Sequence, residues 1–280
     1  MSGRHPPLTT DRRLGAGATA RRGASAPYRA VQIIEGEPHL VREDLRGAEP
    51  GFRAAAGRPL LCLAHITDLQ LADVQSPARF EFLNRYFADP RYAEIVPVQR
   101  PQEALTAHAV DAMLRTLNAA LGPVTGAAPR LAVTTGDAID NAQWNEMQAF
   151  LALFDGGLVR PGSGAPGYAG VQSLDWPDDV FWKPDGAEGD DLFRRELGFP
   201  HHPGLLRRAM LEFSATGLRM PWLSCFGNHE ALNQGVGVVT PDLAAALVGG
   251  RKPVRLPSNF DHDRALERSE ERRVGKECRP

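Results

Sequence analysis

The 280-residue sequence lacks several features that would point directly to a functional class. It has no P-loop, which disfavours a nucleotide-binding module, and no GxSxG motif of a serine hydrolase. Its 32 Lys and Arg nearly balance its 34 Asp and Glu, so no global field favours nucleic acid. No apolar run is long enough to cross a bilayer, and no apolar segment follows the N-terminal Arg pairs. We therefore expect a cytoplasmic protein as written, with no membrane partner, and leave open the export of a longer form.

Cysteine is scarce, and the three residues form neither a CxxC pair nor an even-numbered framework. Cys62 and Cys225 each lie in an apolar, strand-like run, which favours core packing for both. We do not expect a disulfide.

Apolar runs and helical spacing alternate along the middle of the chain. Buried strands are expected at residues 59–66, 130–135 and 220–226, and helices at residues 78–87, 101–121, 144–154 and 204–215. Strands that alternate with helices indicate a layered α/β fold.

The regions around this pattern have a different composition. Residues 1–30 are rich in Gly, Ala, Arg and Pro without periodicity and suggest a mobile leader, with a short strand near residues 31–34. The main domain is expected over residues 31–267. Within it, residues 155–203 suggest an inserted loop or cap, whose aromatic side chains either stack on a substrate or pack a small core.

Three of the expected strands end in polar residues, in the stretches ITDLQ, TTGDAIDN and CFGNHE. Because sites in open α/β sheets gather at the carboxyl ends of strands, we expect these stretches to face one crevice. Gly136 and Gly227 allow tight turns there. Carboxylate, amide oxygen and imidazole suit divalent cations such as Mn, Mg, Fe or Zn, and Asp137 is the natural carboxylate to bridge two of them.

This ordered set resembles the first half of the calcineurin-like metallophosphoesterase signature, D-x-[HQ], GD-x-x-[DN] and GNH-[DE]. It matches at residues 68–70, 136–140 and 227–230, and the resemblance spans roughly residues 60–232. The DLQLAD run is similar to the opening motif of manganese-dependent ADP-ribose and CDP-alcohol diphosphatases. The surroundings and the long insert resemble an uncharacterised actinobacterial metallophosphoesterase group. The resemblance implies a four-layer α-β-β-α sandwich and a two-metal site.

The resemblance also implies roles for individual residues. Asp68 and Gln70 would hold the first metal, Asp137 would bridge both, and Asn228 would hold the second. His229 would lie over the phosphate of a small phosphorylated substrate as the catalytic residue. Three further residues would orient these groups: Asp140, Asn141 and Glu230. Mn, Fe or Mg is favoured and Zn is possible, because a neutral amide at Gln70 is a weaker donor than imidazole to a soft metal.

The second half of the signature, a later His and a GHxH, has no match, and His262 is the one histidine after Glu230. Residues 268–278, RSEERRVGKEC, resemble the translation of a sequencing adapter, so we interpret residues 268–280 as an artefactual tail on a truncated domain. A natural charged tail is the alternative. We expect an incomplete second sheet, an exposed apolar face, weak metal binding and little or no turnover. A non-catalytic fragment or pseudoenzyme that acts as a binding module is the rival hypothesis, and substrate and oligomeric state stay open.

Overall fold

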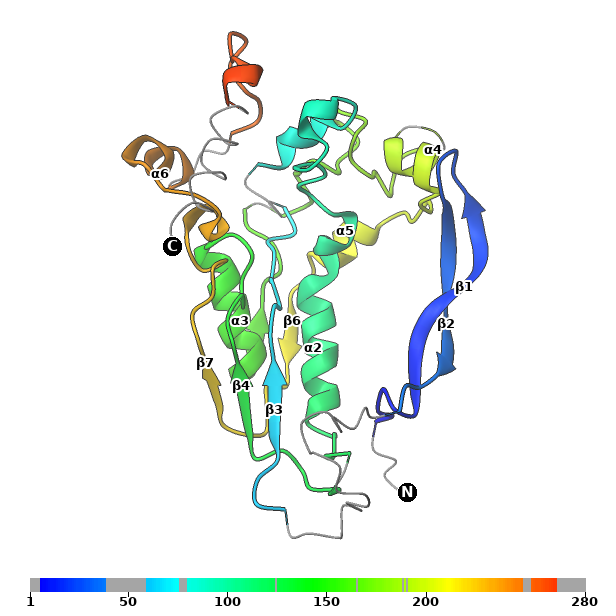
Figure 1. Cartoon of the computed structure of the whole chain (residues 1–280), viewed down its shortest axis with the longest axis vertical. Helices are drawn as coiled ribbons and strands as arrows, with labels where there is room; N and C mark the ends of the chain where they lie inside the picture. Colours follow the sequence, from blue (N-terminus) through cyan, green and yellow to red (C-terminus); the bar gives the residue numbers. More distant parts are fainter. Residues whose placement is uncertain are drawn as a thin grey trace, which may run out of the picture.

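The computed structural model describes residues 6–38, 59–75, 80–123, 125–164, 166–187, 189, 191–248 and 253–265 (Figure 1). The expected artefactual tail lies outside these residues. Within them, no helix combines the length and the apolar character that crossing a membrane requires.

A three-stranded parallel sheet lies at the centre of the molecule. Its strands are β3 (Leu63–Ile66), β4 (Leu131–Thr134) and β7 (Trp222–Ser224), in the order β3-β4-β7. In the register, Leu63 pairs with Leu131 and Ala132 pairs with Trp222. All three strands were expected from their apolar runs, and each is shorter than its run. The α/β class is confirmed.

Two helices cover one face of this sheet: α2 (Thr106–Leu117) and α3 (Trp144–Asp155). The expected helix over residues 101–121 begins as a 3₁₀ turn, η3 (Pro101–Leu105), while the helix expected at 144–154 is confirmed. Leu114, Leu153 and Phe154 are almost completely buried between helices and sheet, where apolar burial stabilises the fold. Trp222 packs edge-on against Phe154, with ring centroids 5.1 Å apart.

The opposite face of the same sheet is open among the residues that the structure describes. Leu63 and Leu223 point to this face, and their exposed fractions are 51% and 62%. His65 pairs with Val133, which in turn pairs with Leu223, and it is also exposed. Leu63 and Leu223 lie on the two outer strands of the sheet, β3 and β7. Half-exposed leucines on one sheet face form an apolar surface of the kind that promotes association.

Replacing both leucines with lysine, Leu63→Lys with Leu223→Lys, is expected to raise solubility several-fold and to reduce self-association. The reason is that charges on an open sheet face oppose pairing with another surface. Sedimentation velocity and the saturating concentration measure both effects. Leu174→Lys replaces a 60% exposed leucine outside the sheet and serves as the control. Equal association of the double variant and the wild type would contradict this assignment of the apolar surface.

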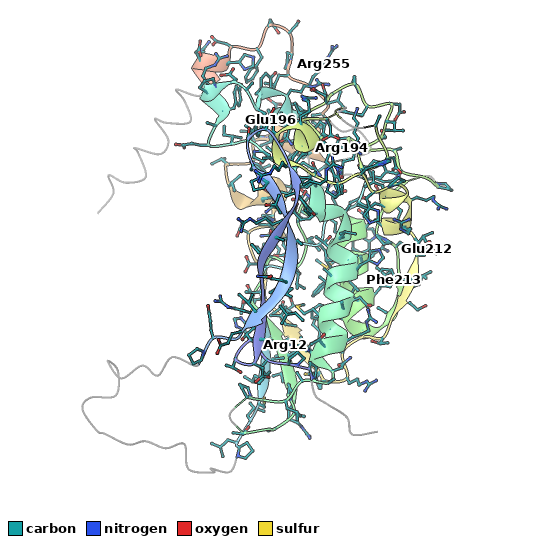
Figure 2. The ribbon with its side chains drawn as sticks, turned by 90° about the vertical axis from the view of Figure 1, so that its right-hand side faces the viewer. Arg12, Arg194, Glu196, Glu212, Phe213 and Arg255 are labelled. Atoms are coloured by element: carbon teal, nitrogen blue, oxygen red, sulfur yellow. The ribbon has the colours of Figure 1, made fainter. Side chains whose placement is uncertain are left out.

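The N-terminal region corrects the expectation of an irregular leader over residues 1–30. β1 (Arg12–Arg22) and β2 (Pro27–Glu35) form an antiparallel hairpin, which includes the short strand expected near residues 31–34. Its turn contacts α4 (Leu192–Leu197), where the amide of Ser25 donates to the carbonyl of Glu196 at 2.9 Å. Figure 2 shows the ribbon running from Arg12 toward Glu196.

The helix expected over residues 204–215 is wrong in its second half. α5 covers only Leu205–Ala209, and β6 (Phe213–Ala215) pairs with β5 (Gly157–Val159). The 3₁₀ helix η1 (Glu81–Tyr86) replaces the α-helix expected at 78–87. The remaining short elements are η2 (Pro90–Tyr92), η4 (Leu232–Gly235) and α6 (Pro241–Leu247).

The region 155–203 packs a small core of its own. Phe181 is fully buried and Trp182 nearly so, which excludes both from stacking on a substrate. The glycines of GSGAPG (162–167) have the spacing of a dinucleotide-binding motif, but the described residues up to Ala187 contain no helix after it. Cys225 is exposed, so the expectation of core packing is wrong for it.

Candidate functional site

The first two polar loops, in the stretches ITDLQ and TTGDAIDN, run side by side beyond the ends of β3 and β4. The amide of Asp68 donates to the carbonyl of Gly136 at 3.3 Å, and the amide of Gln70 donates to the carbonyl of Asp137 at 2.8 Å. Leu71 continues the series with a bond of 3.1 Å to Ala138. These backbone bonds extend the parallel pairing of the two strands past the sheet. They place the loop of Asp68 and Gln70 beside the loop of Asp137.

The third polar loop, in the stretch CFGNHE, contacts the second at Gly136 and Gly227. A Cβ on Gly136 would lie 2.7 Å from the Cα of Gly227, and a Cβ on Gly227 would lie 2.3 Å from Oδ1 of Asp137. Only glycine tolerates such a close approach. The amide of His229 donates to the same Oδ1 at 3.0 Å. The three loops therefore converge, as the sequence predicted.

Glu230 holds this convergence in place. Its carboxylate accepts from four backbone amides: Gly227 at 2.6 Å, Asp137 at 3.1 Å, Ala138 at 2.6 Å and Ile139 at 3.3 Å. One side chain thus satisfies donors on both the second and the third loop. These hydrogen bonds of Glu230 go to backbone amides and form a clamp on the two loops, while its orienting role at a metal site stays a prediction.

His229 lies at the centre of the convergence and is oriented by Asp140. Its Nδ1 is 3.0 Å from the carbonyl oxygen of Asp140 and 3.1 Å from Oδ1 of the same residue. Because both partners are acceptors, Nδ1 carries the proton. Nε2 lies on the other side of the ring, 3.5 Å from Nε2 of Gln70 and 4.0 Å from Oδ2 of Asp137. Burial raises the pKa of Asp140, while the nearby His229 and Arg100 lower it.

Backbone strain is concentrated in the same loops. Asp68, Gln70 and Asp137 have φ values of 55°, 45° and 51°, in the left-handed region that non-glycine residues seldom adopt. Ala142, just beyond the second loop, has a φ of 53°. Such conformations cost about 1–3 kcal/mol each and cluster at functional sites. Three of the four expected metal ligands are held in them.

Two of the expected ligands, Asp68 and Asn228, have side chains that are exposed and bonded to groups outside the expected site. The side chain of Asp68 is exposed and accepts from the hydroxyl of Thr67 at 2.5 Å. Asn228 is also exposed, and its amide nitrogen donates to the carbonyl of Gln234 at 2.7 Å. Their loops reach the site, but the structure records no contact between these two side chains and the carboxylate of Asp137.

The donor chemistry suits hard divalent cations. Asp68 and Asp137 offer carboxylate oxygens, and Gln70 and Asn228 offer amide oxygens, which Mn and Mg accept readily. Within the described ranges, no three His, Cys, Asp or Glu side chains gather closely enough to hold a metal ion. The expected set contains only two side chains of these types, so its amide donors are needed to complete a site.

Two buried carboxylates near the site did not stand out in the sequence. Glu146, at the start of α3, and Asp73, three residues after Gln70, are exposed by only 2% and 1%. Burial raises the pKa of Glu146 to about 7 against the opposing effect of its hydrogen bonds. The signal that could have identified Glu146 is the Gln143-to-Glu146 capping box, which the structure forms.

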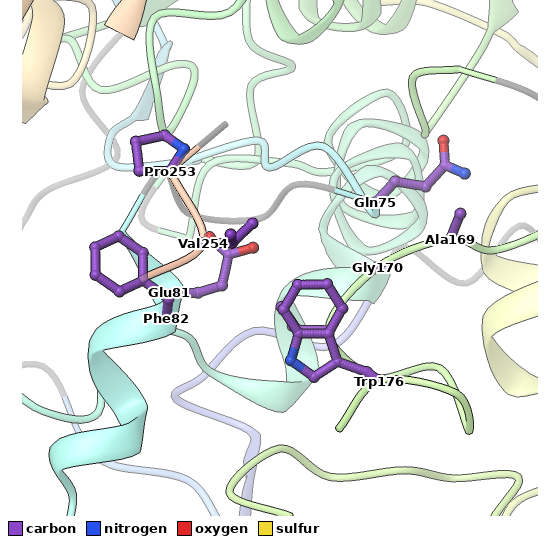
Figure 3. Close-up of a pocket in the computed structure, with 9 residues that line it drawn as sticks. Gln75, Glu81, Phe82, Ala169, Gly170, Trp176, Pro253 and Val254 are labelled. Carbon is purple, nitrogen blue, oxygen red and sulfur yellow. The ribbon is translucent and has the colours of Figure 1, made fainter. Parts of the chain in front are cut away.

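A separate cavity of about 90 Å³ lies beyond Asp73 (Figure 3). Phe82, Val171 and Trp176 contribute to its apolar walls, and Gln75 lines it as well. The amide of Gln75 donates to Asp73 at 2.9 Å, while its side chain points away from the Phe82 ring in Figure 3. None of the eight expected site residues lines this cavity.

Three other histidines of the described residues have partners outside the site. His262 contacts the hydroxyl of Tyr92 through its Nδ1, and His108 stacks on Phe213. His202 contacts Arg208 at 3.2 Å.

No family model, curated protein or solved structure matches the chain.

Proposed function

We propose that this chain carries the site of a metal-dependent phosphoesterase, which hydrolyses a phosphate ester or a nucleotide-type diphosphate. The observation that supports the proposal is the convergence of three strand-end loops, fixed by backbone bonds, two glycine contacts and the Glu230 clamp. Carboxylate, amide and imidazole groups meet there in the order that the resemblance requires. The strained backbone at the same residues adds support.

The four expected ligands, Asp68, Gln70, Asp137 and Asn228, would hold two divalent cations, with Mn, Fe or Mg preferred over Zn. Such cations lower the pKa of a bound water and neutralise phosphoryl oxygens. Because Nδ1 of His229 is bound to Asp140, Nε2 faces the side chain of Asp137 on the other side of the ring. When protonated, Nε2 stabilises a phosphoryl oxygen or donates to the leaving oxygen.

The open face of the β3-β4-β7 sheet supports a finer proposal about the fold. Leu63 and Leu223 lie where a second sheet of an α-β-β-α sandwich would pack. The same observation favours the second candidate function, a non-catalytic module that binds a partner through this face.

Thermal unfolding in the presence of Mn²⁺ and inorganic phosphate tests the proposal. Mn²⁺ is expected to raise the Tm, and phosphate is expected to raise it further only when Mn²⁺ is present, because a ligand that binds the native state stabilises it. In His229→Gln the increment due to phosphate should fall while that due to Mn²⁺ persists.

Release of p-nitrophenol from bis(p-nitrophenyl) phosphate distinguishes the two candidates. A phosphoesterase gives slow release that requires Mn²⁺, and a binding module gives none. A Tm that does not respond to Mn²⁺, Mg²⁺ or Zn²⁺ would contradict the proposed function. Zinc as the best stabilising ion would contradict the preference attributed to Gln70.

A further inference from the structure

The buried carboxylate of Glu146 joins the first polar loop to the second. Its Oε1 accepts from the amide of Asp73 at 3.1 Å, and its Oε2 accepts from the amide of Asn141 at 2.9 Å. Asp73 lies three residues beyond Gln70, and Asn141 lies four residues beyond Asp137. Glu146 is only 2% exposed, so water does not substitute for these bonds.

Every described hydrogen-bond partner of this carboxylate is an N–H donor. Besides the two loop amides, Gln143 donates from its backbone at 3.3 Å and from its side chain at 3.2 Å, and the side chain of Asn141 donates at 3.4 Å. Both oxygens of Glu146 therefore receive donors. An amide at this position would direct an NH₂ group toward other N–H groups, so a glutamine cannot reproduce the arrangement.

The network extends on both sides of Glu146. Asp73 accepts from the side chain of Asn145 at 3.0 Å and from the amide of Ser163 at 3.1 Å, which ties the loop to α3 and to the region 155–203. On the other side, Asn141 donates to the Asp140 carboxylate at 2.8 Å, and Asp140 orients His229. A shift of Glu146 would thus be transmitted to both predicted metal-binding loops.

We propose that Glu146 is a positioning residue that fixes the loop of Asp68 and Gln70 against the loop of Asp137. This inference rests on the proposed metal site. The simpler role, a helix cap through Gln143, contributes stability but leaves the spacing of the loops unchanged. The two roles differ in what a substitution does to the loops.

Glu146→Gln and Glu103→Gln form a matched pair. Glu103 is 5% exposed, burial raises its pKa to about 7 as it does for Glu146, and it accepts from the amide of Arg100 at the start of η3. Its described hydrogen bonds do not join the two loops. Both substitutions remove the charge of a buried helix-capping glutamate, but only one removes the connection between the loops.

The experiment combines hydrogen exchange with Mn²⁺ titration. In Glu146→Gln, the amides of Gln70 and Leu71, which bond to the second loop, are expected to lose protection, and Mn²⁺ affinity is expected to fall about 10–100-fold, the cost of removing a group that orients ligands. Glu103→Gln should change neither. Glu146→Asp keeps the charge on a shorter side chain and should give intermediate effects, and it replaces the Gln variant if that variant does not fold.

Identical exchange and identical Mn²⁺ affinity in the Glu146 and Glu103 variants would overturn the inference. If the wild type binds no Mn²⁺, the proposed function fails. The exchange comparison then still decides whether Glu146 fixes the two loops, because it requires no metal.

Discussion

Asp137→Asn is expected to weaken Mn²⁺ binding by at least about 100-fold. Loss of a residue that only orients a metal ligand weakens binding by up to about 100-fold, and loss of a charged ligand should cost at least as much. The substitution keeps the shape of the side chain. In the wild type the backbone amide of His229 donates to Oδ1 of Asp137 at 3.0 Å, and the side-chain oxygen of asparagine can accept the same bond. The loops should therefore remain together while the central negative charge is lost. Isothermal titration of the wild type and the variant with Mn²⁺ measures the difference.

Asp179→Asn provides the control for this comparison. Asp179 forms a surface ion pair with Arg195 at 2.8 Å, and its side chain is 57% exposed. Mn²⁺ affinity should be unchanged in this variant. Equal affinities of Asp137→Asn and the wild type would show that the carboxylate of Asp137 does not bind the cation.

Glu230→Ala is expected to lower the free energy of unfolding by about 3 kcal/mol. The substitution removes the acceptor of four backbone amides, on Gly227, Asp137, Ala138 and Ile139. Each buried donor left without a partner costs about 1–3 kcal/mol, and water that enters the space recovers part of the total. Chemical denaturation followed by circular dichroism measures the change.

A surface glutamate gives the matched comparison. Glu212 pairs with Arg160 at 2.7 Å, and the two side chains are 52% and 70% exposed. Glu212→Ala should cost less than about 1 kcal/mol, as exposed ion pairs do. If Glu230→Ala costs no more than Glu212→Ala, the clamp does not hold the loops together.

The sequence predicted the parts of the fold that rest on local pattern. The three sheet strands follow from their apolar runs, and α3 follows from helical spacing that ends at Gly156. The convergence at the site was predictable because parallel strands deliver their carboxyl ends to one edge. Gly136 and Gly227 marked the close approach that the structure then showed.

Other elements depend on contacts that no local pattern reveals. β1 has mostly exposed positions, so its sequence carries no alternation of apolar and polar residues. β6 is only three residues long, and its pairing with β5 overrides the helical spacing around it. The bonds of Glu146 to the two loops reach back 73 residues to Asp73 and five residues to Asn141, so only the fold reveals them together.

A crystal structure grown with Mn²⁺ tests the central claim most directly. We predict an anomalous difference peak within coordination distance, about 2.0–2.6 Å, of the Asp137 carboxylate, with an oxygen of Asp68 or Gln70 as a second ligand. A fully bound Mn²⁺ ion at another place in the chain, with none beside Asp137, would contradict the account.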